Sequence, residues 1–217
     1  MITIIDYDRG NLFSLCQALR HLGAEAQVTA NPEEIAQAER LILPGVGAFG
    51  DGMDALRQRG LIDPIHKSVA QGTPLLGICL GMQLMASRGE EFGDHAGLDL
   101  IPGTVRRLPK GNGGSDTVRI PNVGWRRISA KPDHAFLADL PDQPMAYFVH
   151  SFAFETQNPN HTAATIRIND HDIPAAVQRD NLVGNQFHPE KSSTLGLELI
   201  RRFLVSATAA SSDVRVA

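Results

Sequence analysis

A cysteine stands between two glycines where the sequence changes from strand-like to helix-like. Residues 75–83 read LLGICLGMQ, so Gly77 and Gly81 each lie two positions from Cys79. This spacing is typical of a nucleophile elbow, a sharp turn in which the neighbouring backbone comes too close for side chains. The start of the following helix favours the thiolate form of the cysteine. The pattern predicts a nucleophile, although a small buried residue after a strand would also account for it.

A histidine and a glutamate near the C-terminal end could serve this cysteine. Residues 186–190 read QFHPE, and in an extended strand His188 and Glu190 would point to the same side. Pro189 favours an extended backbone at the residue before it. A hydrogen bond from one ring nitrogen to the carboxylate would turn the other nitrogen toward the thiol, as in catalytic triads. The alternative is an ordinary ion pair at a strand end.

A glycine-rich segment follows an apolar run at 41–43. Residues 44–50 read PGVGAFG and could offer backbone N–H groups to the negative charge that develops on a substrate oxygen. They lack the lysine and the Ser/Thr of a phosphate-binding loop, and a plain turn is the alternative. The histidines have no spacing typical of metal ligands, and His150 is interpreted as structural. We therefore expect no metal and no other cofactor.

The elements that would position these residues follow a regular order in the first 80 residues. Apolar runs alternate with helix-like segments, which favours a parallel sheet with helices on both faces. The predicted strands are 2–5, 24–28, 41–43 and 75–78, and the predicted helices start at 12, 32 and 63. After residue 103 short strands predict a partly antiparallel layer, at 105–108, 145–149, 152–155, 163–168, 175–179 and 182–186. A final helix is predicted at about 195–206.

The composition is that of an ordinary globular protein. The 217 residues include 42% hydrophobic and 20% charged residues, and 20 basic against 24 acidic side chains give a net charge of −4. This charge gives no reason to expect nucleic acid or a membrane as partner. Without a signal-peptide pattern or a cysteine framework, we expect a cytoplasmic protein. We expect a single domain over 1–206, a loop at 110–116 and a frayed tail at 207–217.

Together these motifs resemble the class I, or triad, glutamine amidotransferases, and among them the glutaminase subunits of imidazole glycerol phosphate synthase. The resemblance covers nearly the whole chain, at 4–11 (IIDYDRGN), 41–53 (LILPGVGAFGDGM), 74–85 (PLLGICLGMQLM), 97–103 (GLDLIPG), 124–125 (GW), 147–152 (YFVHSF) and 186–193 (QFHPEKSS). It implies an α/β fold of three layers. A mostly parallel central sheet would be flanked by helices, with a smaller antiparallel layer added.

The resemblance implies that glutamine is the substrate and that it is hydrolysed through a thioester. Cys79 would be the nucleophile, His188 the general base and acid, and Glu190 its orienting carboxylate. Backbone N–H groups would form the oxyanion hole, at Leu80 and in the loop at Val46 and Gly47, and this loop would need to rearrange first. The substrate glutamine would be held by Gln83, Glu91, Ser151 and Phe152. His150 belongs to the same substrate-side motif.

The resemblance also implies a partner in a heterodimer, a (β/α)8-barrel cyclase that receives the ammonia. It would form imidazole glycerol phosphate and an aminoimidazole carboxamide ribotide in histidine biosynthesis. The few residues after Glu190 cannot form a synthase domain, so we expect this partner to be a separate chain. Three positions match the interface of the family with that subunit: Asn11, Trp125 and Lys191.

Four positions depart from the family pattern. Asp8, Asn122, Arg126 and Asn185 stand where glycine, histidine, asparagine and an uncharged residue such as valine are usual. An alternative function is therefore a paralogous glutaminase subunit for an amidotransferase that makes acetamidino sugars of surface polysaccharide. A catalytically silent binding subunit and a cysteine hydrolase with another substrate are further alternatives. The complete triad argues against the former, and Gln83 and Glu91 argue against the latter.

Overall fold

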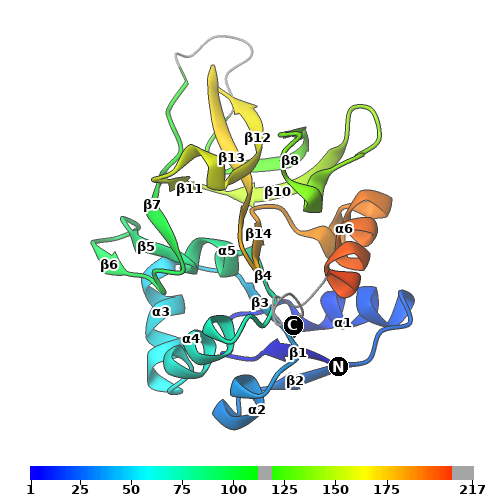
Figure 1. Ribbon diagram of the computed structural model, residues 1–217. Coiled ribbons are helices and arrows are strands. Elements are labelled where there is room, and N and C mark those ends of the chain that lie inside the picture. The colour runs from blue at the N-terminus through cyan, green and yellow to red at the C-terminus, as the bar shows by residue number, and fades with distance from the viewer. Residues whose placement is uncertain (112–118, 207–217) are drawn as a thin grey trace, which may run out of the picture.

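The computed structural model describes residues 1–111 and 119–206 (Figure 1). The expected tail at 207–217 and most of the expected loop at 110–116 lie outside these residues. The N-terminal part alternates strands and helices: β1 (Ile2–Ile5), α1 (Leu12–His21), β2 (Ala26–Thr29), α2 (Pro32–Ala36), β3 (Arg40–Gly45), α3 (Phe49–Gln58), α4 (Ile62–Ala70), β4 (Leu75–Cys79) and α5 (Leu80–Leu84). The predicted alternation is thus confirmed.

Strands dominate the later part of the chain. They are β5 (Ala86–Gly89), β6 (His95–Ala96), β7 (Ile101–Arg107), β8 (Asn122–Arg127), β9 (Ser129–Ala130), β10 (Met145–His150), β11 (Phe152–Thr156), β12 (Thr162–Ile168), β13 (His171–Arg179) and β14 (Leu182–Asn185). Single turns of 3₁₀ helix are η1 (Ala135–Leu137), η2 (Pro159–His161) and η3 (Pro189–Lys191). The last helix is α6 (Ser193–Val205), close to the prediction.

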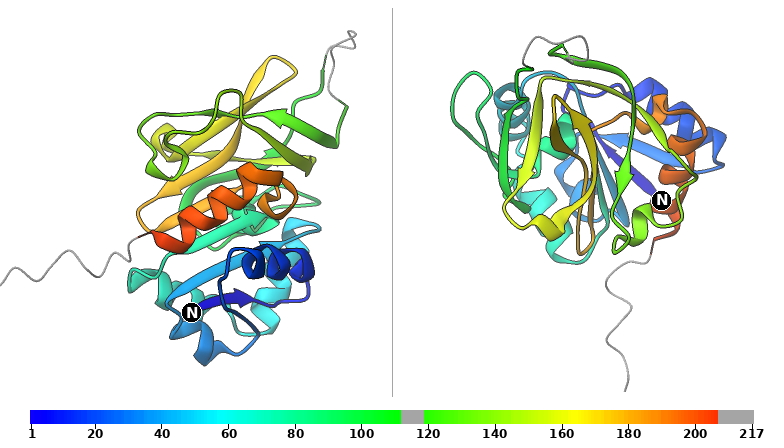
Figure 2. Two further views of the ribbon diagram at one scale, coloured as in Figure 1. Left: turned by 90° about the vertical axis from the view of Figure 1, so that its right-hand side faces the viewer. Right: turned by 90° about the horizontal axis from the view of Figure 1, so that it is seen from above.

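Among the described residues, eight strands form the central sheet in the order β2-β1-β3-β4-β14-β13-β12-β9. The five strands from β2 to β14 are parallel, and the following pairs are antiparallel. Two smaller sheets are β10-β8 and β11-β7-β5-β6. The strands β8 and β10–β13 gather at one end of the molecule, away from β1 and β2 (Figures 1 and 2). The predicted mostly parallel sheet with a smaller antiparallel part is confirmed.

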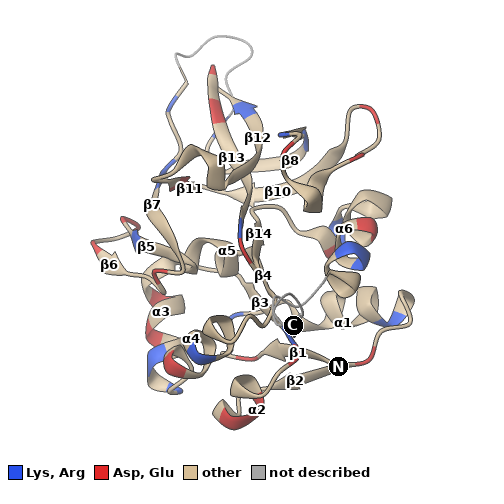
Figure 3. Cartoon of the chain, in the orientation of Figure 1, with Lys and Arg blue, Asp and Glu red and all other residues tan. Residues whose placement is uncertain are grey.

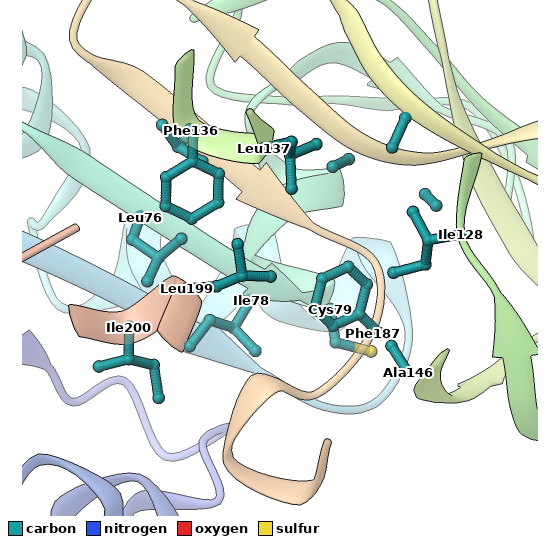
Figure 4. Close-up of a cluster of buried hydrophobic side chains, with 14 of the residues drawn as sticks. Leu76, Ile78, Cys79, Ile128, Phe136, Leu137, Ala146, Phe187, Leu199 and Ile200 are labelled. Carbon is teal, nitrogen blue, oxygen red and sulfur yellow. The ribbon is translucent and has the colours of Figure 1, made fainter. Parts of the chain in front are cut away.

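Alternating side chains give the parallel sheet two apolar faces. Leu76 and Ile78 of β4 pack with α1 and α6 in one buried cluster, whereas Leu75 packs with α3 and α4 in the other. Figure 4 shows Leu76 and Ile78 in the first cluster, beside Leu199 and Ile200 of α6. Charged side chains of both signs lie on α3, α4 and α6 (Figure 3). Both faces of β4 are therefore covered, which fixes the strand that leads to Cys79.

Helix α3 was not predicted, because it begins inside the glycine-rich segment. Gly50 and Gly52 lower its intrinsic helix propensity. A Cβ atom at Gly50 would lie 2.6 Å from the His95 ring, and one at Gly52 would lie 3.1 Å from the Leu80 side chain. These glycines therefore allow α3 to pack closely against its neighbours, and this packing outweighs the propensity.

None of the helices in 1–111 and 119–206 combines the length and the apolar character needed to cross a bilayer.

Candidate active site

Cys79 lies at the turn between β4 and α5. Its φ of 54° and ψ of −110° are a strained backbone conformation for a residue other than glycine. A Cβ atom at Gly81 would lie 1.8 Å from the carbonyl oxygen of Leu43, and one at Gly77 would lie 2.8 Å from the backbone of Met82. Both glycines are therefore required by close backbone approach. This is the geometry of the predicted elbow.

His188 follows β14, the parallel neighbour of β4 in the sheet. Both strands end at the same edge, which brings His188 to Cys79. The His188 N–H donates to the Tyr147 carbonyl at 3.2 Å, and the Ser192 hydroxyl donates to the His188 carbonyl at 2.7 Å. These two hydrogen bonds hold the backbone of His188 against β10 and the start of α6.

The expected extended backbone forms at His188 itself, but it does not continue through Pro189 and Glu190. Pro189 begins the 3₁₀ turn η3, and His188 is its N-terminal cap residue with φ −94° and ψ 100°. The ring Nδ1 of His188 still lies 2.9 Å from Glu190 Oε1, and both side chains are only 3% exposed. The turn is fixed by α6, since a Cβ atom at Gly196 would lie 1.8 Å from the Pro189 carbonyl oxygen. The predicted contact therefore forms by a different local structure.

Hydrogen bonds from two sides set the charge of His188. Burial alone would lower its pKa, but hydrogen bonds with Cys79 and Glu190 and the negative charges of these groups raise the pKa to about 9. The imidazole of His188, which lies between Cys79 and Glu190, is therefore protonated at neutral pH. This arrangement can activate sulfur as a nucleophile and can supply a proton to a leaving group.

A cavity of about 300 Å³ opens above Cys79. Its wall brings together nine of the predicted site residues with Val149 and His150, and these nine are Val46, Gly47, Cys79, Leu80, Gln83, Glu91, Ser151, Phe152 and His188. The cavity therefore joins the glycine-rich loop, the elbow, the loop after β5 and the turn between β10 and β11. Glu190 lies behind His188, away from this wall.

Two polar side chains of the cavity wall have fixed orientations. Gln83 Nε2 donates to the Phe152 carbonyl at 3.0 Å and to Gln186 Oε1 at 2.9 Å. Glu91 Oε2 accepts a hydrogen bond of 2.9 Å from the N–H of Phe49, the first residue of α3. An anionic carboxylate at a helix N-terminus is favourably placed. Glu91 could thus present its other oxygen to a cationic ligand group.

The two predicted sources of oxyanion donors, Leu80 and the loop at Val46 and Gly47, differ in the hydrogen bonds that their N–H groups make. Leu80 is the first residue of α5, so its N–H has no carbonyl partner within that helix. The N–H of Val46 instead donates to the Arg9 carbonyl at 2.6 Å. Gly47 has a φ of 106°, a conformation that glycine adopts readily. The Val46 donor would become free only after the loop rearranges.

His150 is buried and takes part in a defined hydrogen-bond chain. Its Nδ1 lies 2.9 Å from the Phe152 carbonyl, and its Nε2 lies 2.9 Å from Asn122 Nδ2. Asn122 Oδ1 in turn accepts from Arg126 Nε at 2.8 Å. Burial lowers the pKa of His150 to about 4, so its ring is neutral at pH 7. Of the departures from the family pattern, Asn122 thus contacts His150, and Arg126 contacts Asn122.

The three positions expected at an interface lie near the site without lining the cavity. Asn11 precedes α1 and bounds a void of about 10 Å³ together with His188 and Glu190. Trp125 on β8 is 47% exposed and makes an edge-to-face contact with Tyr147 on β10. Lys191 is exposed in η3.

Within the described part of the chain, no group of three or more His, Cys, Asp or Glu residues could hold a metal ion.

Sequence reasoning missed Gln186 and Arg9 as parts of the site. Gln186 Nε2 donates to Cys79 Sγ at 3.8 Å, and the side chain of Gln186 is fully buried. Its position two residues before His188 was a usable signal, because alternate residues of an extended segment share a face. The contact of the Arg9 carbonyl with Val46 left no signal in the sequence.

Comparison with known proteins identifies the family. Residues 3–207 match the glutamine amidotransferase class-I family. The chain belongs to this family of class I glutamine amidotransferases. A relative from Acaryochloris marina, "Imidazole glycerol phosphate synthase subunit HisH", is 44% identical over 217 residues, which cover 99% of both chains. The HisH subunit of Microcystis aeruginosa is 43% identical over 205 residues, covering 94% of both chains.

A solved structure is also similar in fold. The structure of PurLQS from Thermotoga maritima has a TM-score of 0.71 at 17% identity and covers 94% of this chain and 96% of that chain. At this identity the likeness shows the fold alone. The expected class I amidotransferase fold is confirmed, while the roles of individual site residues stay predictions.

Proposed function

We propose that this chain is the HisH-type glutaminase subunit of imidazole glycerol phosphate synthase. It hydrolyses glutamine to glutamate and ammonia and passes the ammonia to a cyclase subunit in histidine biosynthesis. The observation that carries the proposal is the buried series Cys79–His188–Glu190, which opens onto a cavity with Glu91 in its wall. The identity of 43–44% to HisH subunits over nearly full length favours this pathway over the acetamidino-sugar alternative.

The chemistry follows from the groups around the cavity. The thiolate of Cys79 attacks the carboxamide carbon of glutamine, and the oxyanion accepts a hydrogen bond from the N–H of Leu80. After the loop rearranges, Val46 or Gly47 supplies a second donor. His188 gives its proton to the leaving ammonia. It then takes a proton from water, which hydrolyses the thioester to glutamate and regenerates Cys79.

Substrate recognition is assigned to groups of the same wall. Glu91 binds the cationic amino group of glutamine, because one of its oxygens is already held by the start of α3. Gln83 contributes its remaining side-chain oxygen, since both of its hydrogens are directed elsewhere. The backbone at Ser151 and Phe152 closes the pocket.

The partner is proposed to be a (β/α)8-barrel cyclase in a heterodimer. The β8–β10 pair presents Val123, Trp125 and Val149 as partly exposed apolar side chains next to the cavity. Partner docking would cover these side chains, and aromatic residues are common anchors of such surfaces. Ammonia released at Cys79 would leave toward this surface. The required free thiol favours a reducing compartment, and we propose that the protein acts in the cytoplasm.

The test measures glutamate release from glutamine by the purified chain, alone and with the barrel cyclase of the same organism and its nucleotide ligand. We expect stimulation by the cyclase and loss of the activity in Cys79→Ala. The same Cys79→Ala complex should still use added ammonium salt for synthesis. Loss of the ammonia-dependent synthesis in a folded mutant complex would contradict the division of labour. Stimulation by an acetamidino-sugar amidotransferase instead of the cyclase would assign the chain to the alternative pathway.

A further inference from the structure

Gln186 is a fully buried amide between the nucleophile and the substrate side of the cavity. Asn185 at the end of β14 pairs with Ile78 of β4, so Gln186 comes level with Cys79. Its Oε1 accepts from Gln83 Nε2 at 2.9 Å, and its Nε2 donates to Cys79 Sγ at 3.8 Å. One side chain therefore contacts both the sulfur and a residue of the proposed glutamine site.

The direction of these hydrogen bonds has only one solution. The Phe152 carbonyl can only accept, so the nitrogen of the Gln83 amide must face it. The second N–H of that nitrogen then requires an acceptor, which is Gln186 Oε1. If the Gln186 amide were reversed, its NH2 group would face the NH2 group of Gln83, and its oxygen would point at the Cys79 sulfur. The N–H of Gln186 is thus fixed toward Sγ.

A fixed N–H donor has a specific effect on a thiolate. Hydrogen bonds to charged groups are stronger than those between neutral groups. The donor therefore favours the ionised sulfur and restricts its direction. The Cys79 sulfur thus has two hydrogen-bond partners, the Gln186 amide and the His188 ring. The other end of the amide holds Gln83 so that the free oxygen of Gln83 can serve the substrate.

We propose that Gln186 is a positioning residue that acts through both of its neighbours. Its N–H orients the Cys79 sulfur and stabilises negative charge on it, and its carbonyl oxygen keeps Gln83 oriented. The inference deepens the proposed glutaminase function, but its effect on Cys79 is measurable without glutamine. The residue next to it provides a contrast, because Asn185 is equally buried while its amide has no hydrogen-bond partner among the described residues.

The experiment measures how fast iodoacetamide alkylates Cys79, followed by mass spectrometry of the Cys79 peptide. Wild type, Gln186→Glu, Gln186→Met and the matched control Asn185→Val are compared at pH 7 and pH 9. We expect alkylation at pH 7 to fall about tenfold in both Gln186 variants, with partial recovery at pH 9. Asn185→Val is expected to react within about twofold of wild type, since its side chain makes no such hydrogen bond.

Steady-state kinetics with glutamine in the presence of the cyclase distinguish the role of the Gln186 N–H from the role of its carbonyl oxygen. Gln186→Glu keeps an acceptor for Gln83, so kcat falls and KM stays within about twofold of wild type. Gln186→Met removes both hydrogen bonds, so kcat falls and KM also rises. A merely space-filling role would lower the thermal stability of the variants without this split between kcat and KM.

The proposal is overturned if either Gln186 variant is folded by circular dichroism and alkylates at the wild-type rate, or if Asn185→Val slows alkylation equally. Where these variants do not fold, the alkylation rate of Gln186→Asn is measured instead, because the shorter side chain keeps the amide but places it farther from Sγ. Slower alkylation of Gln186→Asn supports the proposal, and a wild-type rate overturns it. Absence of glutaminase activity in wild type would contradict the proposed function and leave the alkylation result standing.

Discussion

The backbone N–H of Val46 donates a hydrogen bond of 2.6 Å to the backbone carbonyl of Arg9. This contact removes one candidate donor from the wall of the cavity above Cys79. The loop that carries it passes through Gly47 at a φ of 106°. The free chain is therefore expected to hydrolyse glutamine slowly, and a partner that releases the Val46 N–H would raise kcat.

Gly47→Ala tests whether this loop must change conformation. A Cβ atom there would have Arg9 Nη1 at 3.8 Å as its nearest contact, so the substitution acts through the backbone alone. We expect a loss of about 1–2 kcal/mol in unfolding free energy. We also expect partner-stimulated kcat to fall by up to about 100-fold, as for loss of an oxyanion donor. Gly60→Ala is the control, with a φ of 66° and open space around it. It should lose stability and keep kcat, and an equal loss of kcat in Gly60→Ala would contradict the argument.

The pH profile of kcat/KM reports the charge of His188 in the free enzyme. The proposed reaction needs protonated His188 to release ammonia, and its pKa is raised from 6.5 to about 9 by Cys79 and Glu190. The activity should therefore persist through pH 8 and decline near pH 9. Glu190→Gln removes one of the charges that raise this pKa, so its alkaline limb should move to lower pH. An alkaline limb close to pH 6.5 in wild type would contradict the raised pKa of His188.

Asn185→Val should stabilise the protein. Both polar atoms of the Asn185 side chain are buried without a hydrogen-bond partner, which costs about 1–3 kcal/mol. We expect denaturant unfolding to show a gain of about 1 kcal/mol, because valine also suits a strand. Asn122→Val is the contrasting variant, since Asn122 is equally buried and bonds to His150 and Arg126. It should lose stability, and a gain in both variants would refute the reasoning.

His150 should make the folded state sensitive to acid. Burial lowers its pKa from 6.5 to about 4, so between these values the unfolded chain binds a proton that the folded chain does not. Stability is then lost as pH falls from about 6.5 to 4, by up to about 3 kcal/mol. His150→Gln lacks this titration. The difference in unfolding free energy between wild type and His150→Gln should thus shrink from pH 7 to pH 4.5, and a constant difference would be evidence against a neutral His150.

Trp125→Ala should separate partner binding from chemistry. The side chain is 47% exposed and contacts Tyr147, so its removal leaves the core intact. We expect weaker binding to the cyclase by about 2 kcal/mol and an unchanged basal glutaminase rate. Titration calorimetry measures the first and glutamate release measures the second. Val205→Ala is the control, an apolar side chain that is 71% exposed at the end of α6, and it should bind the cyclase like wild type.

Local patterns predicted the parts of the site that depend on neighbouring residues. The elbow at Cys79 followed from two glycines in register, and β4 followed from its apolar run. Helix α3 could not be predicted, since its glycines are explained by contacts with His95 and Leu80. The His188–Glu190 contact was predicted, but through a strand where the chain forms a 3₁₀ turn. A spacing of two residues allows both conformations, and the turn that forms places the Pro189 carbonyl close to Gly196, where only glycine fits.

Contacts between distant segments depend on strand pairing that the sequence does not give. The spacing of Gln186 from His188 indicated a shared face, but it did not indicate the partner of Gln186. Gln186 lies 107 positions from Cys79, and the hydrogen bond between them depends on the register of β14 with β4. No local pattern encodes that register. The same holds for Asn122 and His150, which are 28 positions apart and meet through the antiparallel pairing of β8 with β10.

The late position of β14 in the chain has a consequence for synthesis. This strand lies between β4 and β13, so β4 has an unpaired edge until residues 182–185 have been made. During that interval the segment with Cys79 has neither Gln186 nor His188 beside it. On the proposed mechanism, a nascent chain would then not hydrolyse glutamine before its fold is complete. The same open edge is the place where an incomplete chain would pair with another strand, which makes truncation before β14 a route to aggregation.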